Sequence, residues 1–238
     1  MLLTLGFFFF DMKYLLMVMI PGILITVLAQ WRLKSAYARG SEIQAQCGLT
    51  GAQAAQRILE ANGLDGVPIE ETPGHLSDHY DPSSKVVRLS PEVYHGRSMS
   101  SLGVAAHEVG HAIQDATSYS PLVVRNMAVP LANFGSMAGE LILIGGLLLR
   151  SVGIASVGVV VFSAVVGFQL LNLPCEFNAS SRAREQLQLT GLISHDEDRE
   201  VGSVLNAAAL TYVGAAAAAL LQLAYWVMHI MAMQSDDD

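Results

Sequence analysis

Four long apolar stretches dominate the pattern of hydrophobic and polar positions along the chain. They cover residues 14–31, about 129–149, about 152–173 and about 204–233. Each stretch approaches the roughly 20 residues that an α-helix needs to cross a bilayer core. Each is also apolar on every face, whereas a helix at the surface of a soluble protein is apolar along one stripe. The pattern therefore predicts four transmembrane helices and disfavours four core helices of a soluble protein.

The stretch between the first two predicted spans has the mixed pattern of a folded extramembrane domain. Residues 50–53 fit a capping box that opens a short helix. Ser90-Pro91 has the residue types that begin another short helix. A small antiparallel sheet with a turn at residues 81–84 is predicted from three segments rich in β-branched and aromatic residues, namely 67–71, 76–80 and 85–89.

These elements predict a mainly α, polytopic membrane protein with a small antiparallel β-sheet and a folded extramembrane domain. A turn at Arg150-Ser151 makes the second and third spans a hairpin, which returns the chain to the side that it left. Residues 1–10 are expected to lie in the interface or to extend the first span, in which Pro21-Gly22 predicts a kink. The expected parts are the first span with its N-terminal segment (1–31), the main extramembrane region (32–127), the hairpin (128–173), a second extramembrane segment (174–202), and the last span with an acidic tail (203–238).

The residues directly after the first span indicate its orientation. An aromatic and basic collar, typical of the cytoplasmic end of a span, consists of Trp31, Arg32, Lys34, Tyr37 and Arg39. Both extramembrane segments are therefore predicted to be cytoplasmic, with the two termini on the outer side. The first span is interpreted as a retained anchor because no small-residue cleavage site follows it.

Composition adds three constraints. The chain of 238 residues is 52% hydrophobic and 14% charged, which is unusual for a soluble protein. Its net charge of −8 and the lack of a basic patch predict no binding to nucleic acid. Cys47 and Cys175 are the only cysteines, too few for a disulfide framework, and we expect them to be reduced thiols.

The sharpest chemical signal is an H-E-x-x-H motif in a helix that is predicted to begin near Ser100 or Ser101. His107 and His111 are four residues apart and share one helix face, so both imidazoles can bind one zinc ion. Glu108 can then take a proton from a zinc-bound water. Apolar neighbours predict that this helix is buried, where a metal would offset the cost of the polar side chains. The alternative is a helix with two solvent-facing histidines.

Two histidines leave a catalytic zinc ion short of a protein ligand. The predicted hairpin brings the chain back to the histidines at Glu176, which we prefer as the third ligand and place at a helix start after Pro174. The other candidates are the thiolate of Cys175, His195 in a charged stretch, and two histidines ahead of the motif, His75 and His79.

Several blocks together resemble the bacterial YugP-type neutral zinc metallopeptidases, multi-pass membrane proteins of the glutamate-zincin kind; they are residues 76–82, 89–94, 107–114 and 174–180. The resemblance implies His107 and His111 as zinc ligands, Glu108 as general base and Glu176 as third ligand. The chain departs from the family pattern at Asn178, where aspartate is expected, and at Cys175, where a small apolar residue is expected. An aspartate could orient a ligating histidine, and this role stays open for Asn178.

We therefore predict a zinc endopeptidase of the bacterial cytoplasmic membrane that acts on a protein or peptide substrate. The substrate is expected to pair with an exposed edge of the sheet at residues 76–89. Candidates for supporting the metal ligands or the transition state are Asn178, Ser180, Arg182, His195 and Tyr212. Two rival interpretations are a membrane scaffold or assembly factor that keeps a zinc site, and a transporter that uses Glu140 and His229. We prefer the interpretation that Glu140 and His229 are polar residues that face the helix bundle. The sequence leaves open whether the protein forms a homo-oligomer or binds a membrane-protein partner.

Overall fold

The fold is known from a computed structural model, which describes residues 12–237. The expectation for residues 1–10 lies outside this range. The chain forms two compact units. The helical unit comprises Met1–Ala29, Val124–Asn172 and Tyr212–Asp238, and the α/β unit comprises Gln30–Val123 and Leu173–Thr211.

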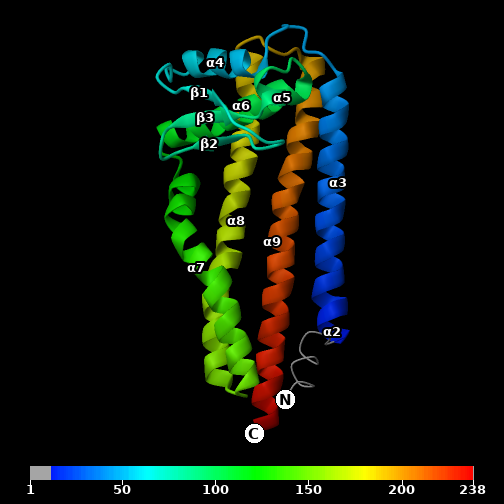
Figure 1. The fold of residues 1–238 in the computed structure, drawn as a ribbon, viewed down its shortest axis with the longest axis vertical. Coiled ribbons are helices and arrows are strands. Elements are labelled where there is room, and N and C mark those ends of the chain that lie inside the picture. Colours follow the sequence, from blue (N-terminus) through cyan, green and yellow to red (C-terminus); the bar gives the residue numbers. More distant parts are fainter. Residues whose placement is uncertain (1–11, 238) are drawn as a thin grey trace. The chain divides into compact units, whose positions relative to one another are not determined.

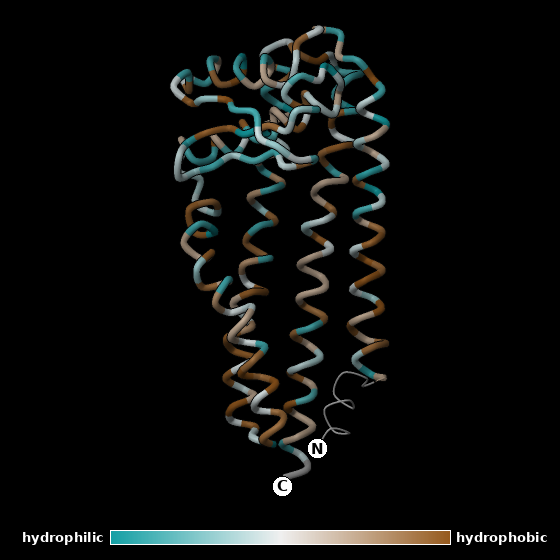
Figure 2. Tube along the Cα trace, in the orientation of Figure 1, coloured by the Kyte–Doolittle hydropathy of each residue, from teal (hydrophilic) through white to brown (hydrophobic). Residues whose placement is uncertain are grey.

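Four helical stretches have the length and composition to cross a membrane: Met12–Glu42, Ser120–Leu148, Val152–Leu189 and His195–Ser235. This confirms the prediction of four candidate spans. The elements within them are α2 (Met12–Tyr14), the π-helical segment η1 (Leu15–Met19), α3 (Ile20–Glu42), α7 (Ser120–Leu148), α8 (Val152–Leu189) and α9 (His195–Asp237). Figure 2 shows apolar residues, drawn in brown, recurring along all four stretches.

In the helical unit, glycines allow α7 and α8 to pack closely after the predicted turn at Arg150-Ser151. A Cβ atom at Gly146 would clash with the backbone of Ala155, and one at Gly158 would clash with the backbone of Leu143. Small residues at such contacts are the usual way in which membrane helices approach each other. Helices α7 and α8 therefore pack against each other along these glycines.

Two prolines differ in their effect from the sequence expectation. The irregularity predicted at Pro21-Gly22 lies just before it, in η1, because a proline ring displaces the carbonyl four residues earlier and offers no N–H to it. Pro174 does not precede a helix start. Helix α8 continues through it to Leu189, so Glu176 lies in the middle of a helix.

The two ionisable residues of the rival transporter interpretation have different environments. Glu140 is exposed on α7, so the prediction that it faces the bundle is wrong. The neighbouring residue, Gly139, packs against Phe162 of α8. Successive residues of an α-helix are rotated by about 100°, so the side chain of Glu140 points away from that contact. His229 stacks on Tyr225 at 5.9 Å between ring centroids, as a packing role predicts.

The α/β unit contains α4 (Gly51–Ala61), β1 (Ile69–Glu71), β2 (His79–Asp81), β3 (Val86–Leu89), α5 (Pro91–Tyr94) and α6 (Met99–Ala116), which lie close together in Figure 1. The predicted capping box is present, since the N–H of Gln53 donates to Oγ1 of Thr50 at 3.2 Å and the N–H of Thr50 donates to Oε1 of Gln53 at 3.0 Å. At the start of α6, Ser98 accepts a hydrogen bond from the N–H of Ser101 at 3.1 Å. Each cap satisfies a backbone donor that a helix start leaves free.

The sheet is mixed, so the prediction of a purely antiparallel sheet is wrong. Its strand order is β1-β3-β2, with β3 antiparallel to β2 and parallel to β1. The turn after β2 is tight because the carboxylate of Asp81 accepts hydrogen bonds from Ser83 and Ser84, and a tight turn makes β2 and β3 antiparallel. A longer connection between β1 and β2 lets β1 lie on the other side of β3. Both β1 and β2 are therefore edge strands.

Helix α6 lies at the centre of the core of the α/β unit. Its Leu102, Ala105 and Val109 are fully buried. Other core residues come from α4, β3, α5 and the parts of α8 and α9 in this unit, among them Ile58, Leu59, Val87, Leu89, Val93, Ala183, Leu187 and Val201. A helix surrounded in this way has little freedom to move, so the side chains that it presents to one site are held in fixed positions.

Candidate metal centre

Two helices bring three side chains that could bind a metal ion to one point of the α/β unit. Helix α6 supplies His107 and His111, and α8 supplies Glu176. The Oε2 atom of Glu176 lies 3.2 Å from Nε2 of His107 and 3.7 Å from Nε2 of His111. Around a tetrahedral zinc ion with bonds of about 2.0–2.2 Å, ligand atoms lie roughly 3.3–3.6 Å apart. Both the donor types and their spacing therefore fit zinc.

The two helices approach this closely because of the glycine inside the motif. A Cβ atom at Gly110 would lie 2.6 Å from the carbonyl oxygen of Ala179, so any larger residue would push α8 away from α6. Ala179 follows Glu176 by three residues and lies on the same face of α8. The close contact at Gly110 therefore sets the distance between the carboxylate and the two imidazoles.

Gln114 determines which nitrogen of His111 faces Glu176. The amide nitrogen of Gln114 donates to the carbonyl oxygen of Cys175 at 2.8 Å and to Oδ1 of Asn178 at 3.0 Å. Its amide oxygen consequently faces His111 and accepts a hydrogen bond from Nδ1 at 2.9 Å. With the hydrogen on Nδ1, Nε2 keeps a free lone pair in the ring plane, and this lone pair points toward Glu176, where a metal would bind.

His107 is held in a similar way, because its Nδ1 lies 3.2 Å from Oγ of Ser180. Ser180 is one of the residues predicted to support the ligands, and it contacts a histidine of the motif. Gln114 was missed from the sequence, although it lies three residues after His111 and therefore on the same helix face. Buried polar residues at that offset from a metal-binding histidine are the signal that would have found it.

The candidate centre holds two carboxyl groups, those of Glu108 and Glu176, next to its two histidines. Burial acts to lower the pKa of His111, but hydrogen bonding to Glu176 and the negative charge of Glu108 outweigh it, so the pKa of His111 is raised. Two carboxylates facing two histidines therefore favour a cation at this point.

Glu108 lies beside this group and is 8% exposed. Burial raises the pKa of its carboxyl group; the nearby histidines oppose this effect, whereas the charges of Glu176 and Asp78 add to it. Its Oε2 accepts a hydrogen bond from the backbone N–H of Tyr80 at 2.9 Å. A carboxylate with a raised pKa is suited to exchanging protons near neutral pH.

The edge strand β2 is attached to α6 next to Glu108. Besides the backbone bond to Glu108, the hydroxyl of Tyr80 donates to Oδ2 of Asp115 at 2.9 Å. Tyr80 pairs with Val87 of β3 on its other side. The edge of β2 that does not pair with β3 therefore faces the candidate centre.

The other predicted supporting residues lie in different surroundings. Oδ1 of Asn178 accepts from Gln114 and, at 2.8 Å, from Nε of Arg182, so neither Asn178 nor Arg182 has a hydrogen bond to a histidine of the motif. His195 is exposed at the start of α9, in the charged stretch noted in the sequence. Tyr212 belongs to the helical unit.

The remaining candidates for the third ligand do not join the group. His75 pairs with Glu92 at 2.6 Å, and Nδ1 of His79 lies 2.8 Å from the carbonyl oxygen of Ser77. Within residues 12–237, the cluster with metal-ligand spacing consists of His107, His111 and Glu176, without Cys175.

Fold and site together define a class: a helical membrane protein with a small α/β unit that carries a candidate zinc centre. The chain belongs to the family described as "putative neutral zinc metallopeptidase", whose model matches residues 15–231. It is 50% identical over 200 residues to the "Putative membrane protease YugP" of Bacillus subtilis (strain 168), covering 84% of this chain and 89% of that protein. No solved structure matches the chain. The protein is thus a membrane protein of a zinc peptidase family.

Proposed function

We propose that the protein is a membrane-embedded, zinc-dependent endopeptidase. The observation that carries this proposal is the convergence of Nε2 of His107 and Nε2 of His111 on Oε2 of Glu176. The buried carboxylate of Glu108 beside them supplies a base. Family membership supports the same class of reaction.

In this proposal His107, His111 and Glu176 hold the ion. Zinc, when bound, polarises the scissile carbonyl and lowers the pKa of water. Glu108 takes a proton from the attacking water as the oxygen–carbon bond forms. It then gives that proton to the amide nitrogen as the carbon–nitrogen bond breaks, which leaves an amine and a carboxylic acid. The acid's proton then passes to the amine, so the products are an ammonium group and a carboxylate.

We place the substrate along the free edge of β2. An extended peptide that adds to a sheet edge is held by its backbone, so its sequence matters little to this contact. The backbone N–H of Tyr80 already points from that edge to Glu108. A peptide aligned there would present a carbonyl group close to both the base and the metal ligands.

We place the centre on the cytoplasmic side of a bacterial cytoplasmic membrane, with both termini outside. The collar of Trp31, Arg32, Lys34, Tyr37 and Arg39 supports this orientation, because basic residues concentrate at the cytoplasmic ends of spans.

The proposal is tested by removing the metal from purified full-length protein in detergent. We expect about one zinc ion per chain by elemental analysis, as in other sites with three protein ligands and an open position. A chelator should abolish cleavage of an unfolded protein substrate, and added zinc should restore it. Cleavage that persists after the zinc has been removed would contradict the proposal.

Gln114 provides a further prediction about the centre. Gln114→Leu removes the acceptor that orients His111, and we expect zinc affinity to fall about 10–100-fold, as for comparable outer partners of metal ligands. Gln114→Glu keeps an acceptor for Nδ1 and should retain most of the affinity. The measurement is competition for zinc with a chelator of known affinity. Equal affinity in the leucine variant and the parent would show that Gln114 does not position His111.

A further inference from the structure

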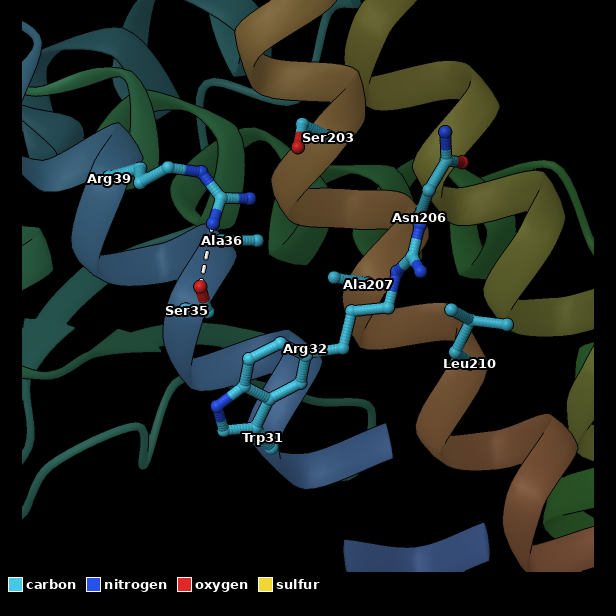
Figure 3. A pocket seen from close by; sticks show the side chains of 9 residues that line it. All are labelled: Trp31, Arg32, Ser35, Ala36, Arg39, Ser203, Asn206, Ala207 and Leu210. Carbon is cyan, nitrogen blue, oxygen red and sulfur yellow. Dashed lines mark hydrogen bonds between the residues drawn. The ribbon is translucent and has the colours of Figure 1, made fainter. Parts of the chain in front are cut away.

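A pocket of the α/β unit lies between α3 and α9, as Figure 3 shows. Its volume is about 310 Å³, at the lower end of the roughly 300–1,000 Å³ of small-molecule sites. Arg32 and Arg39 of α3 and Ser203 and Asn206 of α9 supply polar groups to it. Trp31 and Leu210 supply apolar surface. In Figure 3, Arg32 extends from α3 toward α9.

The polar groups of this pocket suit an anion. No carboxylate lines it, and neither arginine forms an ion pair with any of the residues that the structure describes. Nη1 of Arg39 donates to Oγ of Ser35 at 2.6 Å, which leaves its other N–H groups available. Guanidinium groups bind phosphate oxygens through paired hydrogen bonds, and the amide of Asn206 and the hydroxyl of Ser203 can bind neutral oxygens.

The pocket lies where both helices change from polar to apolar. The apolar stretch of α3 ends at Trp31, and that of α9 begins at Val204. Tryptophan and arginine are typical of the level of the lipid headgroups. Trp31 is 66% exposed and Leu210 is 39% exposed, so apolar surface adjoins the two arginines. A ligand with an anionic group next to hydrocarbon fits this arrangement.

Close packing holds the two walls of the pocket at a fixed separation. A Cβ atom at Gly40 would lie 2.5 Å from Oγ of Ser100 and 3.0 Å from Cγ2 of Val204, so glycine allows α3 to approach both α6 and α9. The hydroxyl of Ser100 also donates to the carbonyl oxygen of Tyr37 at 2.8 Å. Less conformational freedom is then lost when a ligand binds.

We propose that this pocket binds the headgroup of an anionic phospholipid. Arg32 and Arg39 bind the phosphate, Ser203 and Asn206 bind the polar headgroup, and Trp31 and Leu210 contact the start of the acyl chains. Basic pockets between membrane helices are known to bind anionic headgroups. Inorganic phosphate would use only the first of these three contacts, so the lipid binds more tightly.

Trp31 allows the proposal to be tested directly, because the chain has two tryptophans and Trp226→Phe leaves Trp31 as the single tryptophan, whose fluorescence can be excited selectively. The full-length protein is reconstituted in phosphatidylcholine vesicles that contain phosphatidylglycerol with brominated acyl chains, or brominated phosphatidylcholine at the same mole fraction. We expect stronger quenching of Trp31 by the anionic lipid. Arg32→Gln and Arg39→Gln should each weaken this preference about fivefold.

Lys34→Gln is the matched control. It removes the same charge from the same helix, between the two arginines, but Lys34 does not line this pocket. The preference for anionic lipid should stay close to that of the parent. An equal loss in all three variants would reveal only a general surface attraction and would overturn the proposal.

Two further outcomes would also overturn it. One is the absence of any preference for phosphatidylglycerol in the parent protein. The other is displacement of the brominated lipid by inorganic phosphate at low concentration, which would assign the pocket to a soluble phosphate compound. Circular dichroism of each variant shows whether its helices have formed.

Discussion

Replacing Glu176 by alanine is expected to leave the purified protein without bound zinc. The carboxylate is 3% exposed and contacts both histidines of the motif, so alanine at this position removes one of the three side chains that would hold the ion. Removal of a residue that only orients a ligand costs about 10–100-fold in affinity, and removal of a ligand should cost more than about 100-fold. Elemental analysis and a competing chelator measure the effect.

Glu185→Ala is the control for this result. Glu185 lies on the same helix, nine residues further on, and is exposed. This variant should bind zinc as the parent does. If Glu176→Ala also bound zinc with unchanged affinity, another side chain would be the third ligand and our assignment of the centre would be wrong.

Replacing Glu108 by glutamine is expected to abolish cleavage while zinc stays bound. A glutamine side chain can still accept the hydrogen bond from Tyr80, but it cannot take a proton from water. General bases contribute about 10²–10⁴-fold to enzymatic rates, and we expect a loss of that order in kcat. The measurement is the rate of peptide cleavage, with zinc content determined on the same preparation.

Asp115→Asn is the matched control for that variant. Asp115 lies on the same helix, seven residues after Glu108, and also contacts Tyr80, but it is outside the metal-binding group. Its cleavage rate should remain near that of the parent. Unchanged cleavage in Glu108→Gln would assign the base elsewhere. Loss of cleavage without loss of cellular function would favour a membrane scaffold that keeps a zinc site.

The features predicted correctly from the sequence are those that depend on neighbouring residues. The four candidate spans follow from continuous apolar stretches, and the helix start at Thr50 follows from a capping pair three residues apart. Such signals are local, so they do not depend on how the rest of the chain folds.

The errors concern contacts between distant parts of the chain. The three strands were recognised, but the parallel pairing of β1 with β3 depends on the path of the connection between β1 and β2. Pro174 suggested a helix boundary, yet α8 continues through it, as membrane helices often do when neighbouring groups satisfy the freed carbonyl.

The candidate centre was predictable only in part for the same reason. The spacing of His107 and His111 is local, and the hairpin topology pointed to Glu176. The network from Arg182 through Asn178 and Gln114 to His111 joins α8 to α6, and no spacing along the chain reveals it. The packing of α8 against α6 therefore determines that Asn178 contacts Gln114 and not a histidine of the motif.

Gly110 limits how far the motif can be transferred to other proteins. Although the pattern H-E-x-x-H leaves its two central letters open, the second of them is here confined by a carbonyl oxygen of α8. Grafting the two histidines and the glutamate onto an unrelated helix would reproduce the ligands without the neighbour that delivers the third. To reproduce this centre in another protein, a designer would need to transfer both helices together with the glycine at their closest contact, and not the five-residue motif alone.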